Sequence, residues 1–254
     1  MQNEIICSNT LKYTSHKYYL CVVMPAYNEG ALIKENLLRA SHILSGFVRN
    51  YQIIAVNDGS TDNTSDAIHE AAQADSHIAY ISYTDNMGKG YAITTGVRHA
   101  NADYIAFLDS DMELNPKMLR YFLRALQTTD ADIAIGSKLH KKSKLNYPVS
   151  RKILSVGYYV LLKLLFNLKL KDTQTGIKLF KSDIIKPICS SLQSYGYAFD
   201  IEILAKAVNQ GYKIIELPIE LNYSRPKNEK TRFSIKQIFT IFKETLKIRK
   251  AIKK

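Results

Sequence analysis

The stretch Tyr104-Ile-Ala-Phe-Leu-Asp109-Ser-Asp111-Met-Glu113 decides how the rest of the chain is interpreted. Its apolar start is typical of a buried strand, and three acidic side chains follow at alternate positions. If the backbone stays extended, these side chains point to the same side and converge. Their mutual repulsion favours a hard cation, Mg2+ or Mn2+, which in turn binds a diphosphate. The alternative is a solvated acidic turn that caps the next helix.

Apolar runs of strand length alternate with segments of helical periodicity through the first half of the chain. The expected strands cover residues 19–24, 52–56, 78–83, 104–108 and 132–136. The expected helices cover 33–47, 67–74 and 91–100, and Asn115-Pro116 opens another helix. Such alternation with short loops indicates an α/β fold, with a mostly parallel central sheet flanked by helices.

Polar clusters follow the expected strands at residues 25–29, 57–62, 85–90 and 109–113. Ligands of open α/β sheets bind beyond the carboxyl ends of the strands. Four separate loops are therefore expected to meet at one crevice, which favours a binding site over four independent solvated turns.

Composition narrows the classes of partner. The 254 residues carry a net charge of +12, which suits nucleic acid, an anionic membrane surface or phosphorylated substrates. The three cysteines, Cys7, Cys21 and Cys189, are far apart, so they predict a reducing compartment and no zinc site. We expect no secretion signal at the N-terminus and no helix that crosses a bilayer, because lysines interrupt the nearest apolar run, 153–170.

The second half of the sequence lacks the regular strand–helix alternation of the first half. A basic loop at 138–144 precedes a long apolar helix at 151–170, and helices at 182–192 and 199–210 lead to a strand at 212–217. From residue 233 onward, Phe and Ile form one face of a helix and lysines decorate the rest. A basic amphipathic helix of this kind is expected in a membrane interface. The alternative is that it packs on the core or against a second copy in a homo-oligomer.

Several polar side chains in the first half have a ligand-binding and a structural interpretation. Gly88-Lys89-Gly90 lets the backbone approach a phosphate or a base, or it is a simple turn. Tyr27 is placed to pack on a base or ribose, while Glu29 accepts a hydrogen bond or acts only as a charge at a helix start. Asp58 binds a base edge or caps the following helix.

A basic set lies in the second half. Arg151 and Ser155 stand at i and i+4 on one helical face, and with Lys138 they are placed to hold phosphate oxygens. The alternative is a surface arginine and a buried serine.

The order of these motifs resembles family 2 glycosyltransferases. The resemblance rests on VVMPAYNE at 22–29, VNDGSTDNT at 56–64, NMGKG at 86–90 and FLDSD at 107–111. Within the family, the chain is most similar to the polyprenyl-phosphate sugar transferases, and DTQTGIKLF at 172–180 is similar to the dolichyl-phosphate glucosyltransferase branch. FDIEIL at 199–204 and GYKIIELP at 211–218 extend the likeness, which spans roughly residues 20–235.

The resemblance implies a GT-A nucleotide-sugar-binding fold, a metal and inversion at the anomeric carbon. Nucleotide-sugar binding then falls to Pro25, Ala26, Tyr27, Glu29, Asp58, Gly88, Lys89, Asp109 and Ser110. The metal ligands are Asp109, Asp111 and Glu113, and the catalytic residues are Asp111, Arg151 and Asp172. The acceptor phosphate falls to Lys138, Arg151, Ser155, Arg225 and Arg232.

The chain departs from the family pattern at three positions. Asn57 replaces the first Asp of Asp-Asp-Gly-Ser, which puts any role of that acid in doubt, and Glu113 replaces a Gln, which adds a negative charge near the metal. Lys138 replaces an Arg and so lacks a bidentate phosphate fork.

The excess of basic residues favours a phosphate acceptor. A lipid monophosphate is already a strong nucleophile at neutral pH, because its second pKa is near 6, so no general base is required. The expected reaction moves a hexose from UDP-glucose, rather than GDP-mannose, to a polyprenyl monophosphate. The expected enzyme is a transferase domain at 18–232 with an amphipathic helix at 233–254, peripheral on the cytoplasmic face of a membrane.

Three alternatives remain open at this point. A family 2 transferase that glycosylates a hydroxyl needs a carboxylate base, for which Asp172 and Asp200 are the only candidates in the second half. A sugar-1-phosphate nucleotidyltransferase is expected to carry a Gly-rich loop near its N-terminus, which the sequence lacks. A nucleic-acid-binding module is suggested by charge alone and ranks last, so we expect no nucleic-acid partner.

Overall fold

The computed structural model describes residues 5–7, 17–146, 170–196 and 198–222, together with Leu246, Ile248 and Arg249. Its strands are β1 (Ile6–Cys7), β2 (Tyr18–Ala26), β3 (Tyr51–Asp58), β4 (Ile78–Tyr83), β5 (Ala102–Phe107), β6 (Ile133–Ser137), β7 (Lys144–Asn146), β8 (Lys178–Lys181), β9 (Ile214–Pro218) and β10 (Glu220–Asn222). Its helices are α2 (Ile33–Ser45), α3 (Thr64–Ala74), α4 (Lys89–His99), α5 (Leu119–Thr128), α7 (Ser182–Ser190) and α8 (Phe199–Asn209).

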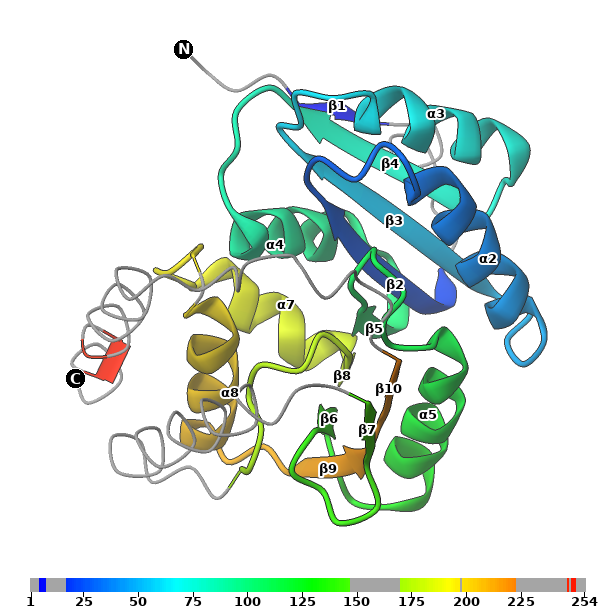
Figure 1. Cartoon of the computed structure of the whole chain (residues 1–254). Coiled ribbons are helices and arrows are strands. Elements are labelled where there is room, and N and C mark those ends of the chain that lie inside the picture. The colour runs from blue at the N-terminus through cyan, green and yellow to red at the C-terminus, as the bar shows by residue number, and fades with distance from the viewer. Residues whose placement is uncertain are drawn as a thin grey trace.

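One eight-stranded sheet organises the molecule, in the order β1-β4-β3-β2-β5-β8-β6-β9 (Figure 1). Strands β4, β3, β2 and β5 are parallel, and β6 is parallel to β9. Strand β8 runs antiparallel to both of its neighbours, β5 and β6, and β1 is antiparallel to β4. A parallel ribbon of β7 and β10 lies beside the sheet. The mostly parallel α/β architecture predicted from the sequence is confirmed.

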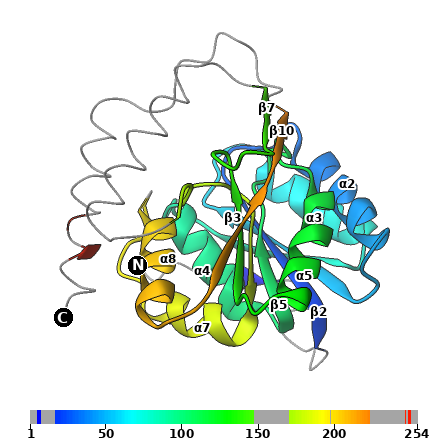
Figure 2. The same cartoon turned by 90° about the horizontal axis from the view of Figure 1, so that it is seen from below.

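Helices cover both faces of this sheet, as the view in Figure 2 makes plain. On one face, apolar residues of α2, α3 and α5, such as Leu37, Ile68 and Phe122, join the core. On the other face, α4, α7 and α8 contribute residues such as Val97 and Ile185. Strands β2 and β3 are buried from both sides, which explains why they occur as nearly continuous apolar runs in the sequence.

The predicted elements of the first half occur at nearly their expected positions, and β4 has the predicted bounds of 78–83. The helix expected after Asn115-Pro116 begins with a short 3-10 turn, where the Asn115 side chain accepts a hydrogen bond from the Lys117 N–H at 2.9 Å. That cap continues into α5. The short strands β1, β7, β8 and β10 were not predicted.

Of the helices in the described residues, none is both long and apolar enough to span a bilayer. The apolar helix predicted at 151–170 falls outside the described residues except for Leu170, and the helix predicted at 233–254 does so except for Leu246, Ile248 and Arg249.

Candidate active site

The acidic stretch after β5 departs from the extended geometry that the sequence predicts. The chain turns at 110–111, and Met112 has a φ of +56°, in the left-handed region. The Asp111 carboxylate accepts a hydrogen bond from the N–H of Glu113 at 3.1 Å, which closes the turn. The three acids therefore do not project from one side of a strand. Within the described residues, no three His, Cys, Asp or Glu side chains form a group that could hold a metal ion.

The donors that remain still suit a hard cation. Mg2+ is commonly held by one or two carboxylates, with water and substrate phosphates completing its shell. Asp109 and Asp111 are both partly exposed at the carboxyl edge of the sheet, so they can offer oxygen ligands from the solvent side. The residues present thus fit Mg2+ or Mn2+ shared with a diphosphate, and they do not form a closed three-carboxylate cage.

Asp109 lies against two other loops. Its carboxylate accepts a charge-assisted hydrogen bond from the Lys89 ammonium at 2.5 Å. A Cβ atom at Gly176 would lie 2.0 Å from Asp109 Oδ2, so a side chain there would displace the carboxylate. Partial burial lowers the pKa of Lys89, but the carboxylates of Asp109 and Asp200 outweigh it, and the pKa of Lys89 is raised overall. Lys89 therefore stays charged beside Asp109.

The loops after β2 and β3 are joined by side-chain hydrogen bonds. The Asn28 N–H donates to Ser60 Oγ at 3.0 Å, and Asn28 Oδ1 accepts from the Thr61 N–H at 2.9 Å. The Glu29 N–H donates to Thr64 Oγ1 at 2.8 Å. Asn28 has a φ of +54°, which an Asn tolerates better than most residues.

The residues predicted to bind a nucleoside are placed on this joined loop pair. Pro25 and Ala26 form the end of β2 and pair with Val56 and Asn57 of β3. Tyr27 follows, and 47% of it is exposed. The loop thus presents an aromatic ring to solvent at the carboxyl edge of the sheet, as an accessible base or ribose contact requires.

Asp58, at the end of β3, is a buried hub and is only 3% exposed. Its Oδ1 accepts hydrogen bonds from Tyr83 Oη and the Met87 N–H, at 2.8 and 2.9 Å. Its Oδ2 accepts from Asn86 Nδ2 and the Gly88 N–H, at 3.1 and 3.0 Å. Two bonds on each oxygen fill the acceptor capacity of a carboxylate. A direct contact of Asp58 with a base edge would have to replace one of these bonds.

Ser110 and Asp172 also hold loops together. The Ser110 carbonyl accepts from Asn36 Nδ2 at 2.9 Å, which ties the acidic turn to α2. The Asp172 carboxylate accepts from the Lys138 N–H at 2.8 Å and from Thr175 Oγ1 at 2.6 Å, and the Lys138 ammonium is 3.6 Å away. Lys138 is therefore brought to the carboxyl end of β6 and neutralised in part by Asp172.

A buried ion pair between β8 and α8 was not predicted from the sequence. Lys178 of β8 donates to Asp200 of α8 and to the Thr175 carbonyl, each at 2.7 Å, and the lysine is 1% exposed. From the sequence, Asp200 is a candidate base for a hydroxyl acceptor, and Lys178 has no assigned role. A lysine between apolar neighbours in Ile177-Lys178-Leu179 was the available signal, since such a lysine is buried only when it is paired.

Four of the predicted phosphate-binding residues lie outside the described part of the chain: Arg151, Ser155, Arg225 and Arg232. The catalytic role of Arg151 and the phosphate roles of all four stay predictions.

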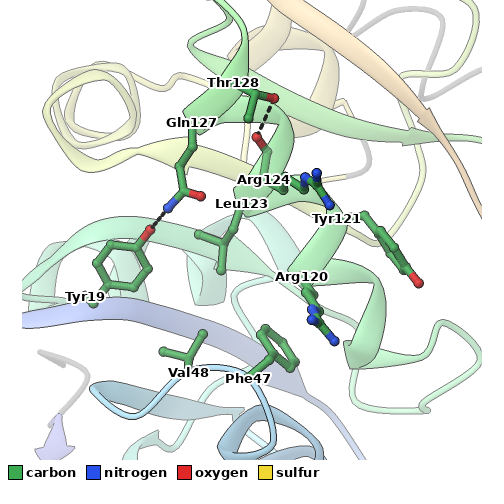
Figure 3. A pocket seen from close by; sticks show the side chains of 9 residues that line it. All are labelled: Tyr19, Phe47, Val48, Arg120, Tyr121, Leu123, Arg124, Gln127 and Thr128. Atoms are coloured by element: carbon green, nitrogen blue, oxygen red, sulfur yellow. Dashed lines mark hydrogen bonds between the residues drawn. The ribbon is translucent and has the colours of Figure 1, made fainter.

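A cavity of about 590 Å³ lies away from these loops, between α5 and the segment that follows α2 (Figure 3). Leu123 and Val48 line it, and a hydrogen bond from Gln127 to the Tyr19 hydroxyl crosses one end. Tyr19 begins β2, whereas Pro25 and Ala26 end it, so the cavity lies toward the opposite edge of the sheet from the predicted site.

Comparison with known sequences points to one family and one branch of relatives. The family described as "Glycosyl transferase family 2" matches residues 21–189. The dolichyl-phosphate beta-glucosyltransferase ALG5A of Trichomonas vaginalis is 32% identical over 216 residues, which cover 80% of this chain and 66% of the relative. The dolichyl-phosphate beta-glucosyltransferase of Saccharomyces cerevisiae is 31% identical, over 79% of this chain and 66% of the relative. The chain thus spans about two thirds of the length of these relatives.

Solved structures agree on the fold. Glucosyl-3-phosphoglycerate synthase from Mycobacterium tuberculosis, in complex with Mn2+, UDP and phosphoglyceric acid, superposes with a TM-score of 0.69 at 17% identity, over 92% of this chain and 78% of that one. The mannosyltransferase PcManGT from Pyrobaculum calidifontis, with GDP-Man and Mn2+, gives a TM-score of 0.58 at 18% identity, over 84% and 59%. The family match, the sequence relatives and the GT-A architecture lead to one statement: the chain belongs to glycosyl transferase family 2.

Proposed function

We propose that this chain is an inverting hexosyltransferase that moves a sugar from a nucleotide diphosphate donor to a polyprenyl monophosphate. The observation that carries the proposal is the meeting of Asp109, Lys89 and Gly176 from three loops at the carboxyl edge of the sheet. A carboxylate for a metal and a cation for a phosphate lie there in direct contact. The curated relatives named dolichyl-phosphate beta-glucosyltransferases supply the acceptor class and favour UDP-glucose over GDP-mannose.

In this proposal the nucleoside lies over the joined loops after β2 and β3. Tyr27 offers its exposed ring to the base or ribose, the Glu29 carboxylate offers a hydrogen-bond acceptor, and Asp58 holds the neighbouring turn at 86–88. Asp109 and Asp111, with Glu113 next to them, would hold Mg2+ or Mn2+. That cation, when bound, stabilises the charge that develops on the departing diphosphate. Lys89 contributes a second positive charge at the same point.

The state of the carboxylates in the second half favours a phosphate acceptor over a hydroxyl. A hydroxyl acceptor needs a carboxylate that is placed to take its proton. Asp172 accepts hydrogen bonds from Lys138 and Thr175, and Asp200 is paired with the buried Lys178. Both candidates already contact protein donors, which supports a phosphate acceptor, since a phosphate needs no base. Lys138 lies at the carboxyl end of β6, and we assign the acceptor phosphate to it, with Arg151, Ser155, Arg225 and Arg232 as further sequence-based assignments.

The same proposal places the protein on the cytoplasmic face of a membrane, where a polyprenyl phosphate is presented. Lys141 and Lys142 are exposed in the loop after β6, next to Lys138. The basic amphipathic segment at 233–254 would add to this attraction for anionic lipids.

The test is a transfer assay with Mg2+ or Mn2+, a short polyprenyl monophosphate, and labelled UDP-glucose and GDP-mannose in parallel. We expect a butanol-extractable labelled lipid from UDP-glucose at a rate well above that from GDP-mannose, and none after chelation of the metal. Donor hydrolysis without lipid product, together with transfer to a sugar hydroxyl, would overturn the acceptor assignment.

A further inference from the structure

A second buried carboxylate, on α8, takes no part in the proposed reaction. Glu202 is 1% exposed, and its side chain accepts hydrogen bonds from two backbone N–H groups of the loop that precedes the helix. The N–H of Gln193 lies 3.0 and 3.1 Å from its two oxygens, and the N–H of Ser194 lies 2.8 Å away. The Lys206 ammonium, one turn along α8, is 2.8 Å from it and balances its charge. Glu202 thus fixes the backbone of this loop.

The residue that follows this anchored loop segment contacts the glycine turn of the first half. The Tyr195 carbonyl accepts a hydrogen bond from the Gly90 N–H at 2.9 Å. Gly90 lies in the first turn of α4, where N–H groups have no partner within the helix, so the loop supplies one. The Tyr195 ring also meets the Tyr91 ring edge to face, with centroids 5.5 Å apart.

The contact is too close for larger residues. A Cβ atom at Gly90 would lie 2.7 Å from the Tyr195 carbonyl oxygen, and one at Gly88 would lie 2.9 Å from it. Gly88 also has a φ of +92°, which side-chain-bearing residues rarely adopt. The glycines of Gly88-Lys89-Gly90 are therefore explained by protein packing.

Lys89 is consequently held from two sides. Upstream, Asp58 accepts hydrogen bonds from the Met87 and Gly88 N–H groups. Downstream, Gly90 is held by the loop that Glu202 fixes. Lys89 is the residue between these two anchors, and its ammonium contacts Asp109.

We propose that Glu202 is a positioning residue, which acts through the loop at 193–195 to keep the Lys89 turn against Asp109. Asp58 is its counterpart on the other side of the turn. The positioning itself depends only on the contacts above, and its effect on catalysis rests on the proposed function.

The test compares amide hydrogen exchange in the full-length wild type and in Glu202→Gln. A glutamine replaces one acceptor oxygen by an NH2 group, so at least one of the three N–H contacts and the negative charge beside Lys206 are lost, and the anchor is weakened. We expect the Gly90 and Ser194 amides to exchange about tenfold faster, with the amides of α3 unchanged. Glu216→Gln is the matched control, because Glu216 accepts from the Lys171 and Asp172 N–H groups of a different loop. It should leave the exchange of Gly90 as in the wild type, because one oxygen of residue 216 accepts both bonds and a glutamine can keep it.

Kinetics separate positioning from a general loss of folded protein. If the Lys89 turn is displaced, KM for the sugar nucleotide rises about tenfold in Glu202→Gln, whereas a smaller folded fraction would lower only the apparent kcat. Should Glu202→Gln fail to fold, Glu202→Asp keeps the buried charge but shortens its reach, and the same exchange pattern is expected.

Unchanged Gly90 exchange in a folded Glu202 variant would overturn the proposal, as would an equal rise throughout the core. If the wild type transfers no hexose, the proposed function fails, and the exchange result still decides the positioning role.

Discussion

The two halves of the sheet bring their functional residues together in different ways. Between β2 and β5, each polar loop follows directly after a parallel strand, and chain order alone places it at the carboxyl edge. Beyond residue 170, strand β8 lies antiparallel between β5 and β6. This part of the chain also contains a buried ion pair, Lys178 with Asp200. In the proposed reaction the first half supplies the metal and nucleotide ligands, and described residues of the second half hold the Lys89 turn through contacts distant in sequence.

The largest expected effect lies in the first half. Asp109→Asn removes the negative charge next to Lys89, and we expect the rate of hexose transfer to fall about a thousandfold, because the metal that binds the diphosphate loses a carboxylate ligand. The measurement is formation of labelled lipid. Asp103 lies near the start of β5, the strand that leads to Asp109, and is exposed and paired with Lys17, so Asp103→Asn should keep nearly full activity. Similar rates in the two variants would remove Asp109 from the site.

The next effect is on stability and belongs to the second half. Lys178→Met leaves Asp200 buried without its cation, at a cost of about 3–5 kcal/mol in the free energy of unfolding. Urea denaturation measures it. Lys181→Met, on the same strand, breaks the more exposed pair with Asp132 and should cost about 1 kcal/mol or less. Equal losses in the free energy of unfolding would show that burial of the Lys178–Asp200 pair does not increase its contribution to stability.

A smaller expected effect is a pH-dependent change in the free energy of unfolding, and it concerns Asp75 in the first half. Burial raises the pKa of the Asp75 carboxyl, but hydrogen bonds from Ser41 and from the His77 N–H and ring outweigh it, so this pKa lies below its ordinary value of 3.8. A carboxyl with a lowered pKa in the folded state stabilises the fold above its unfolded pKa and loses this contribution as the pH falls through the folded value.

Asp75→Asn should therefore cost about 1–2 kcal/mol at pH 7, and the difference from wild type should shrink as the pH falls below about 4. Urea denaturation across this range measures it. A difference that stays constant down to pH 2 would show that the charge of Asp75 does not stabilise the fold.

The contrast between the halves also explains what the sequence could reveal. The apolar runs, the capping Asn115 and the loops at the carboxyl edge follow from local patterns, so they were predictable. Strand β8 is four residues long and pairs with β5, more than 70 positions earlier in the chain, so no local pattern announces it. The turn at Met112 was missed because alternating acids suit an extended backbone equally well.

The four hydrogen bonds that fill the acceptor sites of the Asp58 carboxylate could not be predicted from the sequence, for a related reason. Its donors come from residues 83–88, which are 25–30 positions away. The sequence indicates a carboxylate at the end of a strand, but only the folded chain brings four donors to it. In the structure Asp58 anchors the Lys89 turn, and its assignment to nucleotide binding stays a prediction.

The most direct test of the central claim is the position of Mn2+ in crystals of this protein grown with Mn2+ and UDP. We predict an anomalous scattering peak within about 2.0–2.4 Å of an oxygen of Asp109 or Asp111, with the diphosphate on its other side. A peak bound elsewhere, or UDP bound away from the loops after β2, β3 and β5, would contradict the account.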